Sequence, residues 1–459
     1  MRMKTSDIRT TGKGGADGVR PRLQAVTLGC SKNRVDTEHV LSRLEGLYEI
    51  VPESEEEAVV DVLLLNTCGF IGDAKEESVN AILEAVERKS RGEVGQIIVF
   101  GCLSQRYETE LPELIPEVDA WFGATDTEPI ARALGAGEPS ESAGIERLLT
   151  TPSHYAYLKI SEGCDRRCSY CAIPFIRGRH RSVPMEELVA EAELLAGKGV
   201  KELILIAQDT TYYGLDLYKK RALGELLKKL VKIDGIEWIR IHYSYPDDFP
   251  NDVLELMASE PKICRYIDIP LQHIADPVLS AMRRNVDGEW TRRLVRTMRE
   301  KVPGVMLRTT MIVGHPGEGE KEFEELLDFI AEARFERLGA FRYSEEEGTY
   351  GAEHFKDEVP EEVKQERWNR LMEAQSAISL ECNLARVGSE LRVIVDSYND
   401  GILVCRSEFE SPEVDGEILV KYDPAAFGGA DPLSLVGSFI TVKVTAADEY
   451  DLTADLVSM

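Results

Sequence analysis

The chain has 459 residues, of which 43% are hydrophobic and 30% are charged, and its formal net charge is -28. This composition is that of an ordinary soluble globular protein, and the length allows two to four domains. No run of 18 apolar residues occurs, which excludes a transmembrane helix. Residues 1–21 lack the apolar core of a signal peptide, so we expect a disordered tail there and a cytoplasmic protein with no membrane partner.

The net charge and the number of cysteines indicate which partners and which cysteine functions to expect. A strongly acidic surface repels a phosphate backbone and attracts basic partners. Arginines nevertheless gather at positions 166, 167, 177, 179 and 181, where they can form a locally basic groove. The nine cysteines are an odd number in a long chain without an export signal. In a reducing compartment this favours metal-binding or catalytic cysteines over disulfides.

Residues 22–130 predict an open parallel α/β sheet. Apolar strands are expected at 23–28, 62–65 and 96–100, and helical patterns follow them at 34–44, 73–89 and 105–111. Cys30, Cys68 and Cys102 come directly after the three strands. Because ligands bind at the carboxyl ends of parallel strands, these cysteines should converge. Each one alone reads as a buried apolar cysteine, but their shared position and small or polar neighbours favour a cluster site.

Six further strand–helix alternations predict a second α/β unit. Residues 133–153 are rich in Gly, Pro and Ser and read as a linker. The expected strands beyond it are 157–160, 202–206, 238–242, 266–269, 306–313 and 337–341. Helical patterns between them include 185–196, 223–233, 276–284, 290–301 and 320–333. Six βα units predict a partial (β/α)6 TIM-like barrel whose active face is built from the loops that follow the strands.

The end of the chain changes to short β segments. A charged helix is expected at 356–381, followed by strands at 391–395, 402–406, 417–420 and 439–444. This pattern is typical of a small antiparallel β-barrel of OB-like type. The expected division is therefore a tail at 1–21, an N-terminal domain at 22–132, a linker at 133–153, a core domain at 154–382 and a small barrel at 383–459.

The spacing CxxxCxxC, formed by Cys164, Cys168 and Cys171, is the strongest chemical signal in the chain. Three thiolates can hold three irons of a four-iron cluster and leave the fourth iron open to a substrate. The alternative is a zinc site, which needs a fourth protein ligand. No second CxxC pair occurs in the sequence, and the nearest candidate for a fourth ligand is His180 in an arginine-rich loop.

This spacing, Tyr170 before the last cysteine and the position after the first barrel strand resemble the radical S-adenosylmethionine superfamily. The resemblance implies that S-adenosylmethionine chelates the open iron and is cleaved to a deoxyadenosyl radical, which abstracts hydrogen from an unactivated C–H bond. The cofactors carry this chemistry, so no catalytic side chain is assigned. The barrel loops would bind the S-adenosylmethionine, and the candidates are Gln208, Gln272, His273, Gly314 and Gly317. For each candidate, ordinary loop structure is the competing interpretation.

Three segments narrow the resemblance to the methylthiotransferases: TLGCSKNRVDTEHV, NTCGFIGDAKEES and FGCLSQRY. The end of the chain is similar to the TRAM domain of that family. One branch modifies an adenosine of transfer RNA, and the other, RimO-type branch modifies an aspartate of small-subunit ribosomal protein twelve. Ser31 and Lys32 stand where the transfer RNA branch tends to have Gln and Met. The chain therefore resembles the RimO-type branch, and the transfer RNA enzyme is the alternative.

The RimO-type resemblance implies methylthiolation of the aspartate β-carbon. Two S-adenosylmethionine molecules take part, one as methyl donor and one as radical source. Sulfur is delivered through an auxiliary 4Fe-4S cluster on Cys30, Cys68 and Cys102, while Cys164, Cys168 and Cys171 hold the radical-forming 4Fe-4S cluster. The acidic small barrel suits a basic ribosomal protein, free or on the assembled subunit, better than it suits RNA, and an RNA contact stays open.

Further expectations concern partners and single residues. A reductant such as flavodoxin or ferredoxin is implied. Arg166, Arg167 or Arg177 could bind the substrate carboxylate, against the alternative of a solvated run of charges. The other three cysteines are taken as structural: Cys264, Cys382 and Cys405. A non-catalytic iron–sulfur electron carrier is the interpretation from another class, and the six-unit barrel and the open coordination sites argue against it.

Overall fold

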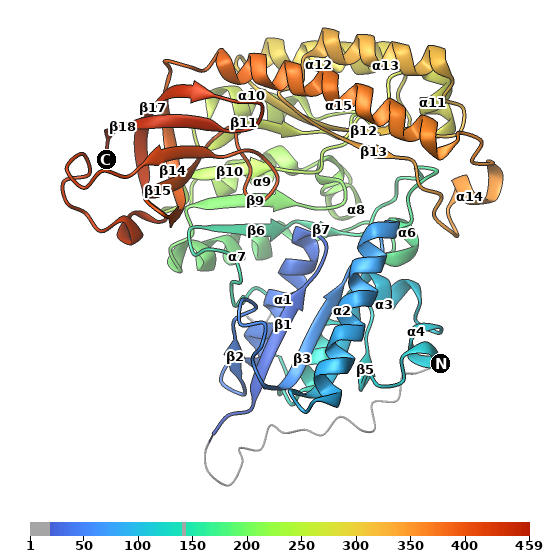
Figure 1. Ribbon diagram of the computed structural model, residues 1–459, viewed down its shortest axis with the longest axis vertical. Helices are drawn as coiled ribbons and strands as arrows, with labels where there is room; N and C mark the ends of the chain where they lie inside the picture. The colour runs from blue at the N-terminus through green and yellow to red at the C-terminus, as the bar shows by residue number, and fades with distance from the viewer. Residues whose placement is uncertain (1–18, 140–143) are drawn as a thin grey trace.

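A computed structural model of the protein describes residues 19–139 and 144–459. Most of the tail expected at 1–21 lies outside the described residues. In Figure 1 the N-terminal sheet lies beneath the six-stranded sheet, and the small C-terminal barrel packs against one end of that sheet. The linking helices α12, α13 and α15 cover the far side. No helix within the described residues is long and apolar enough to cross a membrane.

The N-terminal domain is an open parallel sheet of five strands in the order β2-β1-β3-β4-β5, which confirms the predicted fold. Two short edge strands, β2 and β5, join the three strands that the sequence predicts. The sequence did not predict β2 and β5 because only a few residues form each of them. The strands are β1 (Arg22–Thr27), β2 (Glu49–Val51), β3 (Val60–Thr67), β4 (Val94–Gly101) and β5 (Ala120–Trp121).

The first three helices of this domain follow closely on the ends of strands. The helices are α1 (Ser31–Leu44), α2 (Gly72–Ser90), α3 (Cys102–Arg106), α4 (Leu111–Leu114) and α5 (Thr127–Ala133). The single helix predicted at 105–111 is wrong. The chain instead enters α3 directly from β4, breaks at Tyr107, and resumes in α4 with Pro112 in its first turn. As a consequence Cys102 opens a helix instead of lying in a loop.

The central domain has six parallel strands in chain order, as expected for a partial barrel. The strands are β6 (Tyr155–Lys159), β9 (Glu202–Ile206), β10 (Trp238–Ile241), β11 (Ile263–Asp268), β12 (Met306–Val313) and β13 (Arg337–Arg342). The larger helices between them are α7 (Met185–Gly197), α9 (Leu223–Leu230), α10 (Asn251–Ser259), α11 (Asp276–Ala281), α12 (Gly288–Lys301) and α13 (Glu320–Ala333). Shorter elements near the cysteine motif are β7 (Ser161–Glu162), α6 (Ile173–Ile176) and β8 (Arg181–Ser182).

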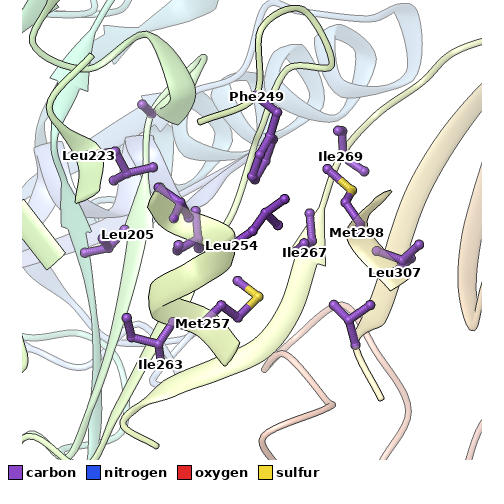
Figure 2. Packing of buried hydrophobic residues seen from close by; sticks show 14 of the residues in the cluster. Leu205, Leu223, Phe249, Leu254, Met257, Ile263, Ile267, Ile269, Met298 and Leu307 are labelled. Atoms are coloured by element: carbon purple, nitrogen blue, oxygen red, sulfur yellow. The ribbon is translucent and has the colours of Figure 1, made fainter. Parts of the chain in front are cut away.

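A large apolar core holds the central domain together. Side chains of the strands meet those of the covering helices, as Figure 2 shows for Leu205, Ile267 and Leu307 on strands and Leu254 and Met257 on α10. All five are at most 2% exposed. Burying such a side chain stabilises the fold by about 1.5–3 kcal/mol, so this packing fixes the strands on which the loops of the active face stand.

The C-terminal domain is a closed five-stranded barrel in the order β14-β15-β16-β18-β17. All its neighbouring strands pair antiparallel except β16 and β18, whose parallel pairing closes the barrel. The final strand, β18, was not predicted. The long helix α15, which precedes the barrel, starts after Pro360 instead of at residue 356. The elements are α15 (Glu361–Leu384), β14 (Glu390–Asn399), β15 (Ile402–Ser407), β16 (Ile418–Lys421), β17 (Phe439–Ala447) and β18 (Leu452–Ser458).

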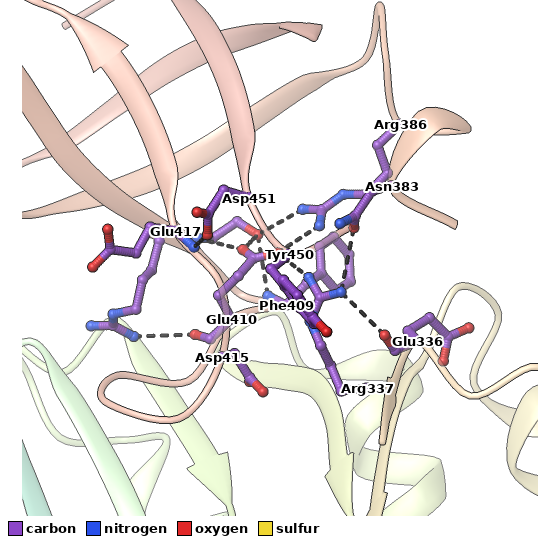
Figure 3. A network of polar contacts seen from close by, with 12 residues as sticks. Glu336, Arg337, Asn383, Arg386, Phe409, Glu410, Asp415, Glu417, Tyr450 and Asp451 are labelled. Carbon is purple, nitrogen blue, oxygen red and sulfur yellow. Dashed lines mark hydrogen bonds and ion pairs between the residues drawn. The ribbon is translucent and has the colours of Figure 1, made fainter. Parts of the chain in front are cut away.

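A polar network fixes the small barrel to the central domain (Figure 3). The Glu410 carboxylate accepts a hydrogen bond from Arg386 at 2.6 Å and lies 3.6 Å from Arg337 of β13. Burial alone would raise the pKa of Glu410, but the two guanidinium groups lower it to about 2. The carboxylate is therefore charged at neutral pH, and the contact is ionic.

The segment 407–417 of the small barrel reaches polar side chains on the central strands. Tyr157 donates to Glu413 at 2.9 Å, and Tyr266 donates to Asp415 at 2.7 Å. Glu413 also lies 3.6 Å from Arg34 of α1, so one carboxylate touches all three domains. The polar residues of the strands thus meet partners from the C-terminal domain instead of solvent.

The segment 133–153, which was expected to be a linker, contacts both neighbouring domains through Arg147. Arg147 is 2% exposed, and its guanidinium pairs with Glu38 of α1 and with Glu191 of α7 at 2.9 Å. A buried arginine between two carboxylates ties the N-terminal domain to the central one. The composition of this segment gives no sign of that contact.

Candidate functional site

The three cysteines of the CxxxCxxC motif lie in one loop on the central domain. The loop leaves β7 at Gly163, whose φ of +74° favours glycine, and returns through β8, which pairs antiparallel with β7. Inside the loop, the Cys164 amide donates to Gly178 at 3.1 Å and the Cys171 amide donates to Cys168 at 3.2 Å. The backbone therefore folds the motif into a compact arch, and we call these three residues the barrel trio.

The barrel trio lines a cavity of about 750 Å³ together with Arg166, Arg167 and Arg283, among others. All three thiols are free and half-buried. Burial raises the pKa of Cys164 to about 12 and raises the pKa of Cys171 as well, and the neighbouring cysteines of the trio add to the rise at Cys171. Metals bind thiolates, so loading this site would release protons.

Cys30, Cys68 and Cys102, the sheet trio, converge at the carboxyl edge of the N-terminal sheet, as predicted from their strand ends. A Cβ placed on Gly29 would lie 2.7 Å from Cys68 Cβ and 3.0 Å from its Sγ, so the turn before Cys30 presses against Cys68. Burial raises the pKa of Cys102 to about 11, an effect that Arg177 opposes and that Cys30 and Cys68 reinforce. The three thiols therefore share one electrostatic environment.

The two trios differ from the tight ligand set that a single metal ion needs. Within residues 19–139 and 144–459, no group of three His, Cys, Asp or Glu side chains is placed to hold one metal ion. A four-iron cluster spreads its thiolates over different irons, so its ligands stand farther apart than those of one zinc ion. His180, the candidate fourth ligand for zinc, bonds Ser182 at 3.0 Å instead.

The two trios lie at the same domain junction. Cys102 packs in one apolar group with Ala172, which directly follows Cys171, and with Ile176 at the end of α6. Lys32 of α1 reaches across as well, with its ammonium 3.1 Å above the ring of Tyr243. Glu346, in the loop after β13, accepts from Lys75 and Arg106 of the N-terminal domain, each at 2.8 Å. These contacts hold the carboxyl edges of the two parallel sheets against each other.

A second cavity, of about 760 Å³, opens at this junction. Its walls include Phe70 from the loop after Cys68, Tyr170 from the barrel trio loop, and Gln272, Ile312 and Tyr343 from the barrel. It thus joins the surroundings of both trios at the face where a barrel of this type has its active site. Its mixed apolar and polar walls and its size suit a nucleoside-sized ligand.

The five predicted S-adenosylmethionine contacts occupy different places. Gln272 lines the second cavity, and its Oε1 is buried with no partner among the described residues. Gln208 donates to Glu162 at 2.9 Å, which leaves its own Oε1 unpartnered within the same residues. His273 is fully buried and bonds Glu318 at 3.1 Å. Gly314 and Gly317 shape the turn after β12, with φ of +77° and +95°.

The arginines named as carboxylate-binding candidates are mostly engaged already. Arg166 pairs with Asp209 at 2.9 Å and with Asp247 at 2.8 Å. Arg177 is buried rather than solvated, and its partners are internal carboxylates. Arg167 is exposed at the mouth of the barrel trio cavity. Of the cysteines taken as structural, Cys264 and Cys405 are buried and Cys382 is half-buried.

The sequence analysis did not identify Arg284 as a residue of the site. Arg284 follows helix α11 and contacts Tyr170, which lies within the loop of the barrel trio. Its guanidinium donates to Tyr170 at 3.2 Å and to the Pro270 carbonyl at 2.7 Å, and it lies 4.3 Å from the ring centre of Tyr245. In the sequence, the one indication of a role is that Arg284 lies shortly after the helix that follows strand β11, and many arginines have such a position.

Three family models match successive parts of the chain. The Radical SAM superfamily matches residues 158–330, Uncharacterized protein family UPF0004 matches residues 22–123, and the TRAM domain matches residues 387–457. Among solved structures, the radical S-adenosylmethionine methyltransferase TsrM from Kitasatospora setae is similar, with a TM-score of 0.53 and 17% identity over 70% of this chain and 72% of that one. At this identity the likeness shows the fold alone.

Curated relatives match nearly the whole chain. The proteins named ribosomal protein uS12 methylthiotransferase RimO from Bacteroides thetaiotaomicron and Porphyromonas gingivalis are 49% and 50% identical, over 96% and 95% of this chain and 99% of each relative. The protein of the same name from Christiangramia forsetii is 51% identical over 94% of this chain and 93% of its own length. The chain therefore belongs to the RimO family of radical S-adenosylmethionine methylthiotransferases.

Proposed function

We propose that the protein replaces a hydrogen on the β-carbon of an aspartate in ribosomal protein uS12 with a methylthio group. The observation that carries this proposal is the position of two cysteine trios at one domain junction, next to a cavity whose walls include Phe70 and Tyr170 from the chain segments of both trios. The name of the near-full-length relatives supplies the substrate protein. The same relatives disfavour the transfer RNA enzyme as the alternative.

The proposed cofactors are two 4Fe-4S clusters and S-adenosylmethionine. Cys164, Cys168 and Cys171 would hold one cluster, and Cys30, Cys68 and Cys102 the other. When bound, these groups supply a radical for hydrogen abstraction, the sulfur, and the methyl group. The trios fit because each consists of three free thiols that the fold brings into one neighbourhood.

The chain itself contributes enclosure and orientation. Gln272 presents an unpartnered amide oxygen to the second cavity, where it can accept a hydrogen bond from a nucleoside or an ammonium group. Tyr170 and Phe70 give the same cavity apolar walls that exclude water from a reactive intermediate. Because Arg166 and Arg177 are paired internally, Arg167 is the remaining arginine candidate for a substrate carboxylate.

The domain division and partners are proposed accordingly. The N-terminal domain at 22–132 would carry the auxiliary cluster, the core at 154–382 the radical chemistry, and the TRAM domain at 383–459 the contact with the basic ribosomal protein. The reaction needs electrons, for which flavodoxin or ferredoxin is the proposed donor, and it would take place in the cytoplasm where ribosomes are.

Mass spectrometry of the substrate tests the proposal. Reconstituted protein is incubated anaerobically with S-adenosylmethionine, dithionite and, in separate reactions, uS12, small ribosomal subunits or transfer RNA. We expect a mass gain equal to one methylthio group replacing one hydrogen, located on an aspartate-containing peptide. The matched control is the variant with Cys164, Cys168 and Cys171 changed to Ala. A gain only in transfer RNA nucleosides would establish the alternative instead.

A further inference from the structure

Arg177 makes contacts that connect the two trios. It lies six residues after Cys171, at the end of α6, yet its Nε donates to Cys102 Sγ at 3.3 Å. Its Nη2 donates to Asn33 Oδ1 at 2.6 Å. The residue is only 4% exposed. A guanidinium from the loop of the barrel trio therefore enters the sheet trio and directly contacts one of its sulfur atoms.

Asn33 extends this contact to the other two strand ends. Its Nδ2 donates to the Leu28 carbonyl at 2.9 Å and to the Thr67 carbonyl at 3.2 Å. Leu28 and Thr67 are the last residues before the Gly29-Cys30 turn and before Cys68. The Arg177–Asn33 pair thus touches the backbone or the sulfur beside every cysteine of the sheet trio.

Two carboxylates hold the guanidinium in place. Arg177 Nη1 donates to Asp36 Oδ2 at 2.9 Å and to Glu162 Oε2 at 3.0 Å. Lys159 contacts the same two carboxylates, and Gln208 donates to Glu162. Two cations and two anions balance in this group, so the buried ions compensate one another. Nε, the nitrogen that faces Cys102, is left free of these ion pairs.

Hydrogen bonds and positive charge beside a cluster sulfur stabilise the reduced, more negative form of the cluster and raise its reduction potential. We propose that Arg177 is a positioning residue of the auxiliary site: it fixes Cys102, through Asn33 aligns the other two cysteines, and raises the reduction potential of the cluster they hold. This inference rests on the proposed function, because it requires a cluster on the sheet trio. It assigns to one side chain the coupling between the radical-forming loop and the sulfur-donating site.

The test uses a chain that holds only one cluster. In the variant with Cys164, Cys168 and Cys171 changed to Ala, reconstituted iron belongs to the sheet trio, and its midpoint potential is measured by titration followed with electron paramagnetic resonance. Into this background go Arg177→Lys, which keeps the charge, and Arg177→Met with Asp36→Asn, which removes one cation and one anion together. Arg179→Met is the matched control, because Arg179 lies in the same loop but its side chain is 89% exposed.

We expect a more negative midpoint potential for Arg177→Met/Asp36→Asn, a smaller shift for Arg177→Lys, and no shift for Arg179→Met. Loss of iron from either Arg177 variant, with the control fully loaded, also supports the positioning role. Full iron content with an unchanged potential in both Arg177 variants would overturn it. Absence of iron from the background chain itself would instead contradict the auxiliary cluster, and with it the proposed function.

Discussion

The barrel trio and the sheet trio reach similar cysteine sets by different routes. Cys164, Cys168 and Cys171 lie within eight residues, in one loop that opens to a cavity of about 750 Å³. Cys30, Cys68 and Cys102 come from three strand ends, and Cys68 and Cys102 are only 8% and 5% exposed. The first site is local and open, whereas the second exists only when a whole sheet has folded.

The two sites therefore depend on different parts of the fold to hold their cysteines in place. A local loop keeps its ligands close even when the surrounding domain is strained. The sheet trio depends on strand register, on Gly29 and on a guanidinium that belongs to another domain. Perturbations far from Cys30, Cys68 and Cys102 should therefore reach the sheet trio more easily than the barrel trio.

The largest expected effect comes from removing either trio. Reconstituted protein should contain roughly eight irons per chain, as two four-iron clusters require. Changing all three cysteines of one trio to Ala should leave about half of this iron and abolish methylthiolation. Iron analysis and substrate mass spectrometry check both outcomes. An unmodified chain with iron near four would rule out the sheet trio as a cluster site.

Chelation should separate the two sites by their exposure. The barrel trio lines an open cavity, whereas Cys68 and Cys102 are buried. An iron chelator added to the oxidised protein should therefore release iron in two phases, about half of it fast. In the barrel-trio Ala variant the fast phase should disappear. A single phase in the complete protein would mean that exposure does not distinguish the sites.

Two glycines offer a matched pair of smaller perturbations. Gly29→Ala places a methyl group 2.7 Å from Cys68 Cβ at a φ of +93°, and Gly163→Ala places one 2.6 Å from the Arg179 carbonyl carbon at a φ of +74°. Each substitution should cost about 1–3 kcal/mol of local strain. We expect Gly29→Ala to lower the iron of the sheet trio and Gly163→Ala that of the barrel trio.

Single-trio backgrounds identify which cluster each glycine variant affects. Iron is measured with the glycine change in the chain lacking the barrel trio and in the chain lacking the sheet trio. Equal losses in both backgrounds would show that the strain spreads through the junction and that the two sites are not independent.

The smallest effect is expected from Glu346→Gln, which weakens the contact between the domains without touching a cysteine. Glu346 is 4% exposed and accepts from Lys75 and Arg106. Losing its charge should lower the free energy of unfolding by about 1–3 kcal/mol. Calorimetry measures this change, with the exposed Glu358→Gln as control. Iron content should stay the same, so a fall in methylthiolation would report the alignment of the two sites.

Much of the fold was predictable because strands and helices follow from local patterns. The strand ends before Cys30, Cys68 and Cys102 were visible as apolar runs, and the parallel arrangement of the strands followed from the βα alternation. The short strands β2 and β5 were missed, since brief elements carry little periodic signal. Tyr107 and Pro112 broke the helix expected at 105–111.

The contacts between domains were not predictable from the sequence. Arg177 looked like one of several loop arginines, and only the folded chain brings it to Cys102, 75 positions earlier. Arg147 stands in a segment of linker-like composition and is nevertheless buried between two carboxylates. Such pairings depend on tertiary placement, which local sequence patterns do not encode.

The segment 407–417 has a consequence for how the molecule is made. Tyr157, on the first strand of the central barrel, donates to Glu413, which follows it by 256 residues. A chain that emerges from the ribosome therefore completes the first half of the barrel long before Glu413, the partner of Tyr157, has been synthesised. Contacts so distant in sequence form late. Until the C-terminal domain arrives, Tyr157, Tyr266 and Arg308 of the nascent barrel lack their acidic partners from this segment.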